Sequence, residues 1–272
     1  MDGLNQVDGE HLMNFIEGNL GILPASYTTQ AVFFDLGFTL IHFQGDYPSV
    51  LLDSYYSLAR ALKREGYLFE VDEFVRRFKN ALADYYQSRD IDLIERPVET
   101  YLTRVLNTFG HIEPPESVTR NALAEMYQTT EAYWQLMPDT LATLRQLQRT
   151  GYRLGLISNA ANADNVNRLI DRCGLRGFFE VLLISAVEKI RKPDRRIYAR
   201  ALNLLHLTPD RAVMVGDTLT ADIIGAQNAG LRAVWVTSRA SHPENLRARP
   251  HVNPDAVIDQ LSELPYALQQ FH

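Results

Sequence analysis

Three aspartates stand at or just after short apolar segments of the sequence. Asp35 follows the apolar residues 31–34, Asp217 follows the apolar residues 212–215 and a glycine, and Asp222 comes five residues after Asp217. An apolar segment this short, without polar alternation, is typical of a strand buried on both faces of a parallel sheet. Ligands of such sheets bind outside the carboxyl ends of the strands, so we expect the three carboxylates at one edge.

Three carboxylates at one place repel one another, and they cannot all be ionised without a cation. Ligand sets made only of oxygen suit Mg²⁺, which keeps several of its waters. The simpler interpretation of a single aspartate after a strand is a helix N-cap or a turn residue. For Asp35 alone that simpler interpretation is preferred. Two further segments of the chain favour an active site instead.

Ser158 and Asn159 follow another apolar run, residues 154–157, and Lys192 precedes a proline in an arginine-rich stretch. A serine between a strand and a helix offers its hydroxyl and nearby backbone N–H groups to an anion, although Ser-Asn is also ordinary helix-entry sequence. The chain has only four lysines among its 27 lysines and arginines. A compact ammonium fits between carboxylates and a phosphate where a planar guanidinium does not, whereas the usual interpretation of a lysine is a solvated surface charge.

Beyond Pro138 the sequence alternates between strand-like and helix-like segments. Apolar runs predict strands at residues 152–157, 180–184, 212–215, 232–236 and 256–258. Helical spacing predicts helices at residues 140–149, 163–172, 195–205, 221–229 and 261–271. Such alternation is typical of a parallel sheet with helices on both faces, so we expect an α/β core formed by residues 29–46 and 137–272.

Residues 47–136 keep helical spacing throughout, and four amphipathic helices without intervening strands indicate a small bundle inserted as one domain. The Tyr and Phe stripes of these helices are interpreted as core rather than as a binding surface. Residues 1–28 are an N-terminal extension, in which Leu12, Phe15 and Leu20 would fit one or two amphipathic turns. We find no chemistry in that extension.

Composition excludes several classes of protein. An apolar content of 46% and a charged content of 22% are ordinary for a soluble globular chain, and no apolar run reaches the ~18 residues of a membrane span. The N-terminus is acidic rather than basic, and the one cysteine, Cys173, cannot form an internal disulfide, so we expect a cytoplasmic protein. A net charge of −6 argues against a nucleic-acid or membrane partner. The seven histidines lack the spacing of a zinc site.

The order of Asp35, Ser158, Lys192 and the Asp217/Asp222 pair resembles the haloacid dehalogenase superfamily. The helical insert after the first motif looks like the type 1 cap of that superfamily, and the resemblance covers residues 31–270. It implies a Rossmann-like core and a hydrolase of the phosphatase-like branch.

The resemblance also implies roles for individual residues. Asp35 would be the nucleophile that forms an aspartyl-phosphate, with Lys192 and Ser158 assisting catalysis. The residues implied to hold Mg²⁺ are Asp35, Asp217, Asp222 and, through its backbone carbonyl, Gly37. The residues implied to bind the substrate are Ser158, Asn159, Lys192 and Thr39.

Gly37 departs from the pattern, because phosphatases of the superfamily usually carry a second aspartate there as general acid and base. General acid–base help contributes about 10²–10⁴ in rate. Three interpretations stay open. Another group, such as His42, Asp46 or a cap residue, replaces the acid; the leaving group needs no proton; or catalysis is weak and the protein binds a phosphorylated ligand or a partner protein.

Two other branches of the superfamily fit less well. The dehalogenase branch lacks the Gly-Asp-x-x-x-x-Asp motif that Asp217 and Asp222 complete here. The phosphonate-cleaving branch needs a cap lysine, and none occurs between Asp35 and Lys63. We therefore expect a Mg²⁺-dependent phosphatase of a small phosphorylated metabolite, as a monomer or homodimer.

Overall fold

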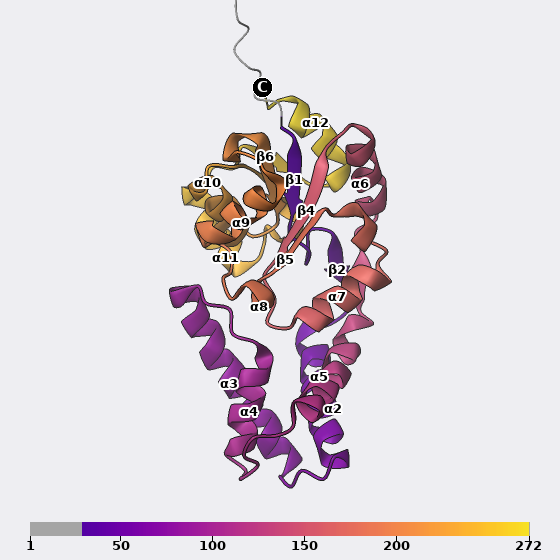
Figure 1. Ribbon diagram of the computed structural model, residues 1–272, viewed down its shortest axis with the longest axis vertical. Helices are drawn as coiled ribbons and strands as arrows, with labels where there is room; N and C mark the ends of the chain where they lie inside the picture. The colour runs from indigo at the N-terminus through magenta and orange to yellow at the C-terminus, as the bar shows by residue number, and fades with distance from the viewer. Residues whose placement is uncertain (1–28, 272) are drawn as a thin grey trace, which may run out of the picture.

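The computed structural model describes residues 29–271, which form an α/β unit and a helical unit (Figure 1). The predicted N-terminal extension, with its amphipathic turns, lies outside the described residues. The α/β unit is built on a six-stranded sheet of order β5-β4-β1-β6-β7-β8, in which all neighbours are parallel. The strands are β1 (Ala31–Phe34), β4 (Arg153–Ser158), β5 (Val181–Ile184), β6 (Ala212–Gly216), β7 (Arg232–Val236) and β8 (Ala256–Ile258). Each matches a predicted strand to within one residue at either end.

Helices cover both faces of this sheet, as predicted. They are α6 (Thr140–Arg149), α7 (Ala163–Arg172), α8 (Ser185–Glu188), α9 (Arg195–Leu205), α10 (Gly225–Asn228), α11 (Pro243–Ala248) and α12 (Leu264–Gln269). Short turns of other helical types are η1 (Arg176–Phe178), η2 (Pro209–Arg211), η3 (Leu219–Ile224), η4 (Thr237–Arg239), η5 (Arg249–His251) and η6 (Leu261–Glu263). Within residues 29–271, no helix is long and apolar enough to cross a membrane.

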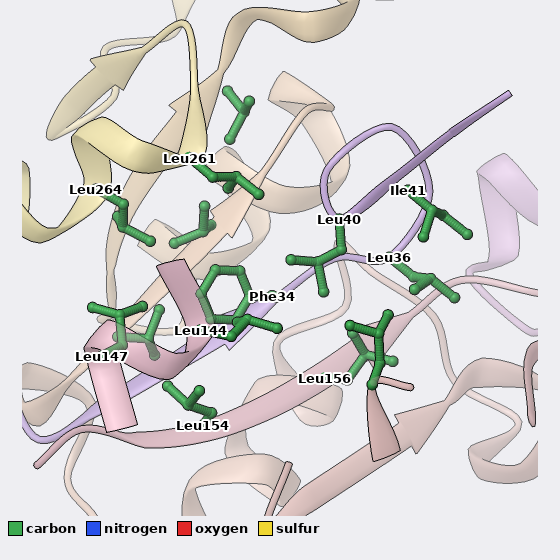
Figure 2. Close-up of a cluster of buried hydrophobic side chains, with 14 of the residues drawn as sticks. Phe34, Leu36, Leu40, Ile41, Leu144, Leu147, Leu154, Leu156, Leu261 and Leu264 are labelled. Carbon is green, nitrogen blue, oxygen red and sulfur yellow. The ribbon is translucent and has the colours of Figure 1, made fainter. Parts of the chain in front are cut away.

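The central strand β1 is buried on both faces, because its side chains alternate between two apolar layers. Val32 and Phe34 belong to a cluster with side chains of α6, α7 and α12. In Figure 2 the ring of Phe34 lies among leucines of α6 and of the C-terminal segment, including Leu144. Ala31 and Phe33 belong to the opposite cluster, with side chains of α9 and α10. The end of β1, where Asp35 follows, is therefore fixed from both sides.

The predicted helix at residues 221–229 is wrong in its type and its start. The structure has the π-helical turn η3 from Leu219, followed by the short helix α10. Oδ2 of Asp222 accepts a hydrogen bond from the backbone N–H of Thr218 at 3.0 Å, which folds the carboxyl group back toward β6. Single π-helical turns are frequent at functional sites, and apolar spacing does not reveal them.

The helical unit is inserted between the first two strands of the sheet and lies beyond their carboxyl ends (Figure 1). Its helices are α2 (Tyr47–Arg64), α3 (Val71–Asp92), α4 (Val98–Asn107) and α5 (Glu116–Glu131). They enclose a core of their own, in which Leu58, Phe74, Phe78 and Leu102 are fully buried. The predicted fold class, a Rossmann-like parallel sheet with an inserted helical cap, is confirmed. The exact boundaries of the predicted domains stay a prediction.

A short antiparallel ribbon marks the place where the chain passes between the two units. Strand β2 (Ile41–Phe43) pairs with β3 (Trp134–Leu136), and the pairing continues where the N–H of Gln44 donates to the carbonyl of Tyr133 at 2.8 Å. Three residues are too few for a periodic signal, so the sequence does not predict this ribbon. The chain thus enters and leaves the helical unit along neighbouring strands.

Candidate active site

The three predicted carboxylates meet at the carboxyl edge of the sheet. Strands β1 and β6 are neighbours with Phe34 opposite Val215, so Asp35 and Asp217 extend from adjacent strand ends. The turn η3 brings Asp222 back to the same place. One carboxylate oxygen from each aspartate lies within 4.8 Å of the others, and Asp217 and Asp222 are almost completely buried.

Lys192 lies between two of these carboxylates. Its Nζ donates to Oδ1 of Asp35 at 2.6 Å and to Oδ1 of Asp222 at 2.7 Å, and the residue is only 2% exposed. The backbone of Lys192 is held by Asn159, whose amide nitrogen donates to the Lys192 carbonyl and whose oxygen accepts the Lys192 N–H, both at 2.9 Å. The ammonium is therefore positioned from a neighbouring strand end. Asn159 lines the cavity, and its predicted role in substrate binding stays a prediction.

These groups lie at one end of a cavity of about 460 Å³ between the α/β unit and the helical unit. Ser158 ends β4 and lines this cavity, and its hydroxyl makes no hydrogen bond to any group of the described chain. Thr39 differs from the prediction in its position, because it is fully buried and does not line the cavity. The structure therefore brings together every predicted site residue except Thr39, whose role in substrate binding stays a prediction.

Residues 29–230 match the haloacid dehalogenase-like hydrolase family. The chain belongs to this family. The resemblance inferred from the order of the motifs is thus confirmed, and with it the expectation of a hydrolase.

Several phosphatases are similar to this chain. A glyceraldehyde 3-phosphate phosphatase of Methanothermobacter thermautotrophicus is 39% identical over 131 residues, which cover 47% of this chain and 56% of that protein. The chain thus matches little more than half of that relative. The enzyme of the same name from Methanopyrus kandleri is 29% identical over 242 residues, covering 86% and 95%. The N-acylneuraminate-9-phosphatase of Homo sapiens is 28% identical over 251 residues, covering 88% and 94%.

Solved structures share the fold of this hydrolase. A 2-haloacid dehalogenase from Pseudomonas syringae pv. Tomato DC3000 superposes with a TM-score of 0.64 at 25% identity, covering 90% of this chain and 100% of that one. A HAD phosphatase from Thermococcus onnurineus superposes with a TM-score of 0.59 at 24% identity, covering 88% and 98%.

The hydrolase site has too little positive charge to keep its three carboxylates ionised. Burial raises the pKa of Asp217 well above its usual range, and the neighbouring charges of Asp35 and Asp222 raise it further. Burial also raises the pKa of Asp222 to about 6, although the ammonium of Lys192 opposes the shift. Burial by itself would lower the pKa of Lys192, but the two carboxylates outweigh it and the pKa is raised. The lysine therefore stays charged, whereas one carboxyl group gains a proton unless a cation compensates it.

The three carboxylates fit a Mg²⁺ site, because they need a cation in order to stay ionised together. Three carboxylate oxygens lie close enough to share one ion, and the backbone of Gly37 lines the same part of the cavity. The cations beside the carboxylates are Lys192 and, at 3.6 Å from Oδ2 of Asp217, the guanidinium of Arg239. A divalent ion with oxygen ligands supplies the charge that these carboxylates need in order to stay ionised.

The side chain next to Gly37 is an indole ring, which cannot serve as the missing acid. A Cβ atom placed on Gly37 would lie 3.6 Å from Cη2 of Trp134, so an indole ring borders the position. Two of the predicted substitutes are elsewhere, because neither His42 nor Asp46 lines the cavity. Asp46 instead caps α2 by accepting the N–H of Ser49 at 3.3 Å. In this structure neither His42 nor Asp46 faces the carboxylates across the cavity, and the group that would replace the acid stays an open prediction.

Sequence reasoning missed further polar residues that line the cavity. They are Tyr47, Tyr55, Tyr86, Tyr127, Arg89 and Arg191. The Tyr and Phe stripes are interpreted as core from the sequence, which holds for Tyr55 in the cap core, whereas Tyr47 and Tyr86 are exposed by 43% and 39%. The signal that could have found them is the use of Tyr where Phe would serve an apolar core equally well.

Proposed function

We propose that this protein is a Mg²⁺-dependent phosphatase that hydrolyses a small phosphorylated metabolite through an aspartyl-phosphate on Asp35. The observation that carries the proposal is the buried ammonium of Lys192 between Asp35 and Asp222, with Asp217 beside them, on the wall of a cavity between the two units. The phosphatases among the relatives support it.

In this mechanism one oxygen of Asp35 is held and the other is free. Lys192 binds Oδ1, whereas Oδ2 makes no hydrogen bond within the described chain, so Oδ2 attacks phosphorus and the bond to the leaving oxygen breaks. Lys192 and the hydroxyl of Ser158 then lie where they can donate to phosphoryl oxygens. Water attacks the phosphorus of the acyl phosphate, which releases phosphate and restores the Asp35 carboxylate. Asp35, Asp217, Asp222 and the carbonyl of Gly37 would hold Mg²⁺, which would supply charge stabilisation for the transferring group when bound.

Dehalogenation is the less well supported chemistry, although a structural neighbour carries that title. A carboxylate that attacks carbon needs no divalent cation, and the pair Asp217 and Asp222 serves one. The absence of an acid at Gly37 is the one observation that favours a second function, in which the protein binds a phosphorylated ligand and turns it over poorly.

Hydrolysis of p-nitrophenyl phosphate separates these functions. We expect turnover that requires Mg²⁺, stops in excess EDTA, and falls on the order of 10³-fold or more in Asp35→Asn, because the amide is no nucleophile. The matched control is Asp53→Asn, which changes an exposed aspartate of α2. Full activity in EDTA or in Asp35→Asn would refute the mechanism. Calorimetric binding of inorganic phosphate without turnover would support the binding function instead.

A further inference from the structure

Four tyrosines of the helical unit line the cap end of the cavity, the part formed by α2, α3 and α5. Tyr47 and Tyr55 come from α2, Tyr86 from α3 and Tyr127 from α5. None of their hydroxyls makes a hydrogen bond to another group in residues 29–271. For Tyr55, which is buried, this is unusual, because a buried tyrosine hydroxyl usually finds a partner, whereas Tyr47 and Tyr86 are exposed by 43% and 39%. Burial raises the pKa of all four phenols, so they remain neutral donors. Hydroxyls that line a cavity and have no protein partner can donate to a ligand with acceptor oxygens.

Arg89 lies among these tyrosines and also has unused donors. Its guanidinium carbon lies 4.2 Å from the ring centroid of Tyr86 and 5.4 Å from that of Tyr85, and its side chain is 23% exposed. Within the described part of the chain, no side-chain nitrogen of Arg89 makes a hydrogen bond, and Nε is buried. The nearest carboxylate oxygens, of Asp90 and Glu95, are 3.7 and 3.8 Å away. A planar guanidinium held in this way is suited to bidentate binding of an anion.

The carboxylates near Arg89 are already engaged by other donors. Glu95 is fully buried and accepts hydrogen bonds from the hydroxyls of Tyr85 and Ser185. Asp90 accepts a hydrogen bond from Arg191 at 3.0 Å, and its side chain is 69% exposed, so water weakens its field. Arg191 adds a second guanidinium to the cavity wall, and its Nε is likewise buried without a hydrogen bond. Two guanidiniums thus face the cavity beside one fully buried carboxylate.

We propose that this cap end binds a second anionic group of the substrate, a carboxylate or a further phosphate, through Arg89 with the tyrosine hydroxyls as additional donors. The inference rests on the proposed function, because the first anionic group is the phosphate at Asp35. A cavity of about 460 Å³ accommodates a compact substrate that reaches from the sheet edge to Arg89. The substrate class is therefore a small phosphate ester with an acidic group at its far end.

Matched substrate pairs test this proposal. The carboxylate pair is 3-phosphoglycerate and glycerol 3-phosphate, and the phosphate pair is fructose 1,6-bisphosphate and fructose 6-phosphate. We expect at least about 10-fold higher kcat/KM for the doubly anionic member of one pair, and which pair shows it identifies the group. In Arg89→Met the preference should fall about 10- to 100-fold, mainly through KM, because the substituted side chain still covers Tyr86 but donates nothing.

The matched control is Arg104→Met. Arg104 is an exposed arginine of the same cap that lies over a tyrosine ring, Tyr101, but outside the cavity. Its substitution should leave the preference unchanged. If Arg89→Met does not fold, as judged by its melting temperature, Arg89→Lys keeps the charge, removes the planar fork and should still reduce the preference.

An equal kcat/KM within both pairs, or a preference that survives in Arg89→Met, would overturn the inference. If no phosphate ester is hydrolysed, p-nitrophenyl phosphate included, the proposed function fails instead. Calorimetric binding of 3-phosphoglycerate against glycerol 3-phosphate to the unmodified protein then still decides whether the cap end prefers the second anion.

Discussion

Lys192 makes the most demanding arrangement in the site, because it is a fully buried cation whose two partners are both proposed to act in the reaction. Its position between Asp35 and Asp222 leaves no room for a larger head group. The sequence singles out Lys192 as a candidate site residue, because it lies in an arginine-rich stretch of a chain that has only four lysines. The shape of the ammonium, as well as its charge, is therefore expected to matter.

We expect Lys192→Arg to lower kcat by at least about 10²-fold, since the guanidinium cannot fit between two carboxylates that are bridged by a single nitrogen. Turnover of p-nitrophenyl phosphate measures the effect, and Lys79→Arg, on the exposed face of α3, is the matched control. A Lys192→Arg variant with near-native kcat would show that charge alone is sufficient.

Gly37 gives a second prediction at this scale, and the structure removes an obstacle to testing it. Gly37 does not have a positive φ, whereas Phe38 beside it does, at 61°. A Cβ atom at position 37 meets only the indole of Trp134, at ordinary contact distance. We expect Gly37→Asp to raise kcat/KM for alkyl phosphates selectively, by up to the ~10²–10⁴ that general acid help supplies.

The measurement is a series of phosphate esters with leaving groups of graded acidity. Native protein should favour the most acidic leaving groups, and Gly37→Asp should flatten the series. Gly37→Asn, which has the same size but no transferable proton, is the control. A flat series in the native protein would mean that another group donates the proton, and the cap tyrosines would be examined next.

At the scale of elements, the turn from β6 into η3 places two of the three carboxylates. This turn depends on the close approach of Gly216 to Asp222, because a Cβ atom on Gly216 would overlap the Asp222 carboxyl group. Gly216→Ala should therefore displace Asp222, with a loss of about 1–3 kcal/mol in the free energy of unfolding and at least 10-fold weaker Mg²⁺ binding.

Thermal unfolding and calorimetric Mg²⁺ titration measure both effects. Gly177→Ala is the matched control, because its Cβ would meet no atom within 4 Å. Equal Mg²⁺ affinity in Gly216→Ala and Gly177→Ala would contradict the claim that this contact sets the position of Asp222.

The same turn makes the effect of Mg²⁺ depend on pH. Because the pKa values of Asp217 and Asp222 are raised in the folded chain, the stability they contribute without a cation is fully present below about pH 4. The contribution of Asp222 is lost as pH rises through about 6, and that of Asp217 is lost as pH rises through its own raised pKa. Mg²⁺ needs the ionised carboxylates. The increase in Tm on adding saturating Mg²⁺ should therefore be small near pH 5 and larger near pH 7.5. Differential scanning calorimetry measures it, and an increase independent of pH, or one retained in Asp217→Asn, would contradict the assignment.

Elements of the sheet were predicted more completely than elements of the site. Short apolar runs define buried parallel strands and hence the edge where Asp35 and Asp217 meet, so the fold and the catalytic end follow from local patterns. The π-helical turn η3 and the three-residue strand β2 have no such pattern. The role of Arg89 was also not predicted, because helical spacing indicates which face of α3 is buried but not that its neighbours leave the guanidinium without a hydrogen bond.

At the scale of the whole molecule, direct contacts hold the cap over the sheet edge. Asn162 donates to Glu99 at 2.8 Å, Arg168 donates to Glu131 at 2.8 Å, and the N–H of Val98 donates to a core carbonyl at 3.0 Å. These contacts hold the helical unit against the α/β unit, with the cavity between them.

The ribbon of β2 and β3 makes this cap an exchangeable part. Because Gln44 and Tyr133 already pair as neighbours, a two-residue Asn-Gly turn between them would join the ribbon into an ordinary hairpin, and any insert whose ends match that spacing would fit in its place. The sheet edge would then determine the reaction and the cap would determine the substrate. The cap could be replaced without changing the reaction. A chimaera that carries a foreign helical insert should still fold and hydrolyse p-nitrophenyl phosphate while taking the substrate range of the donor. Failure of all such chimaeras to fold would show that the α/β unit depends on its own cap for folding.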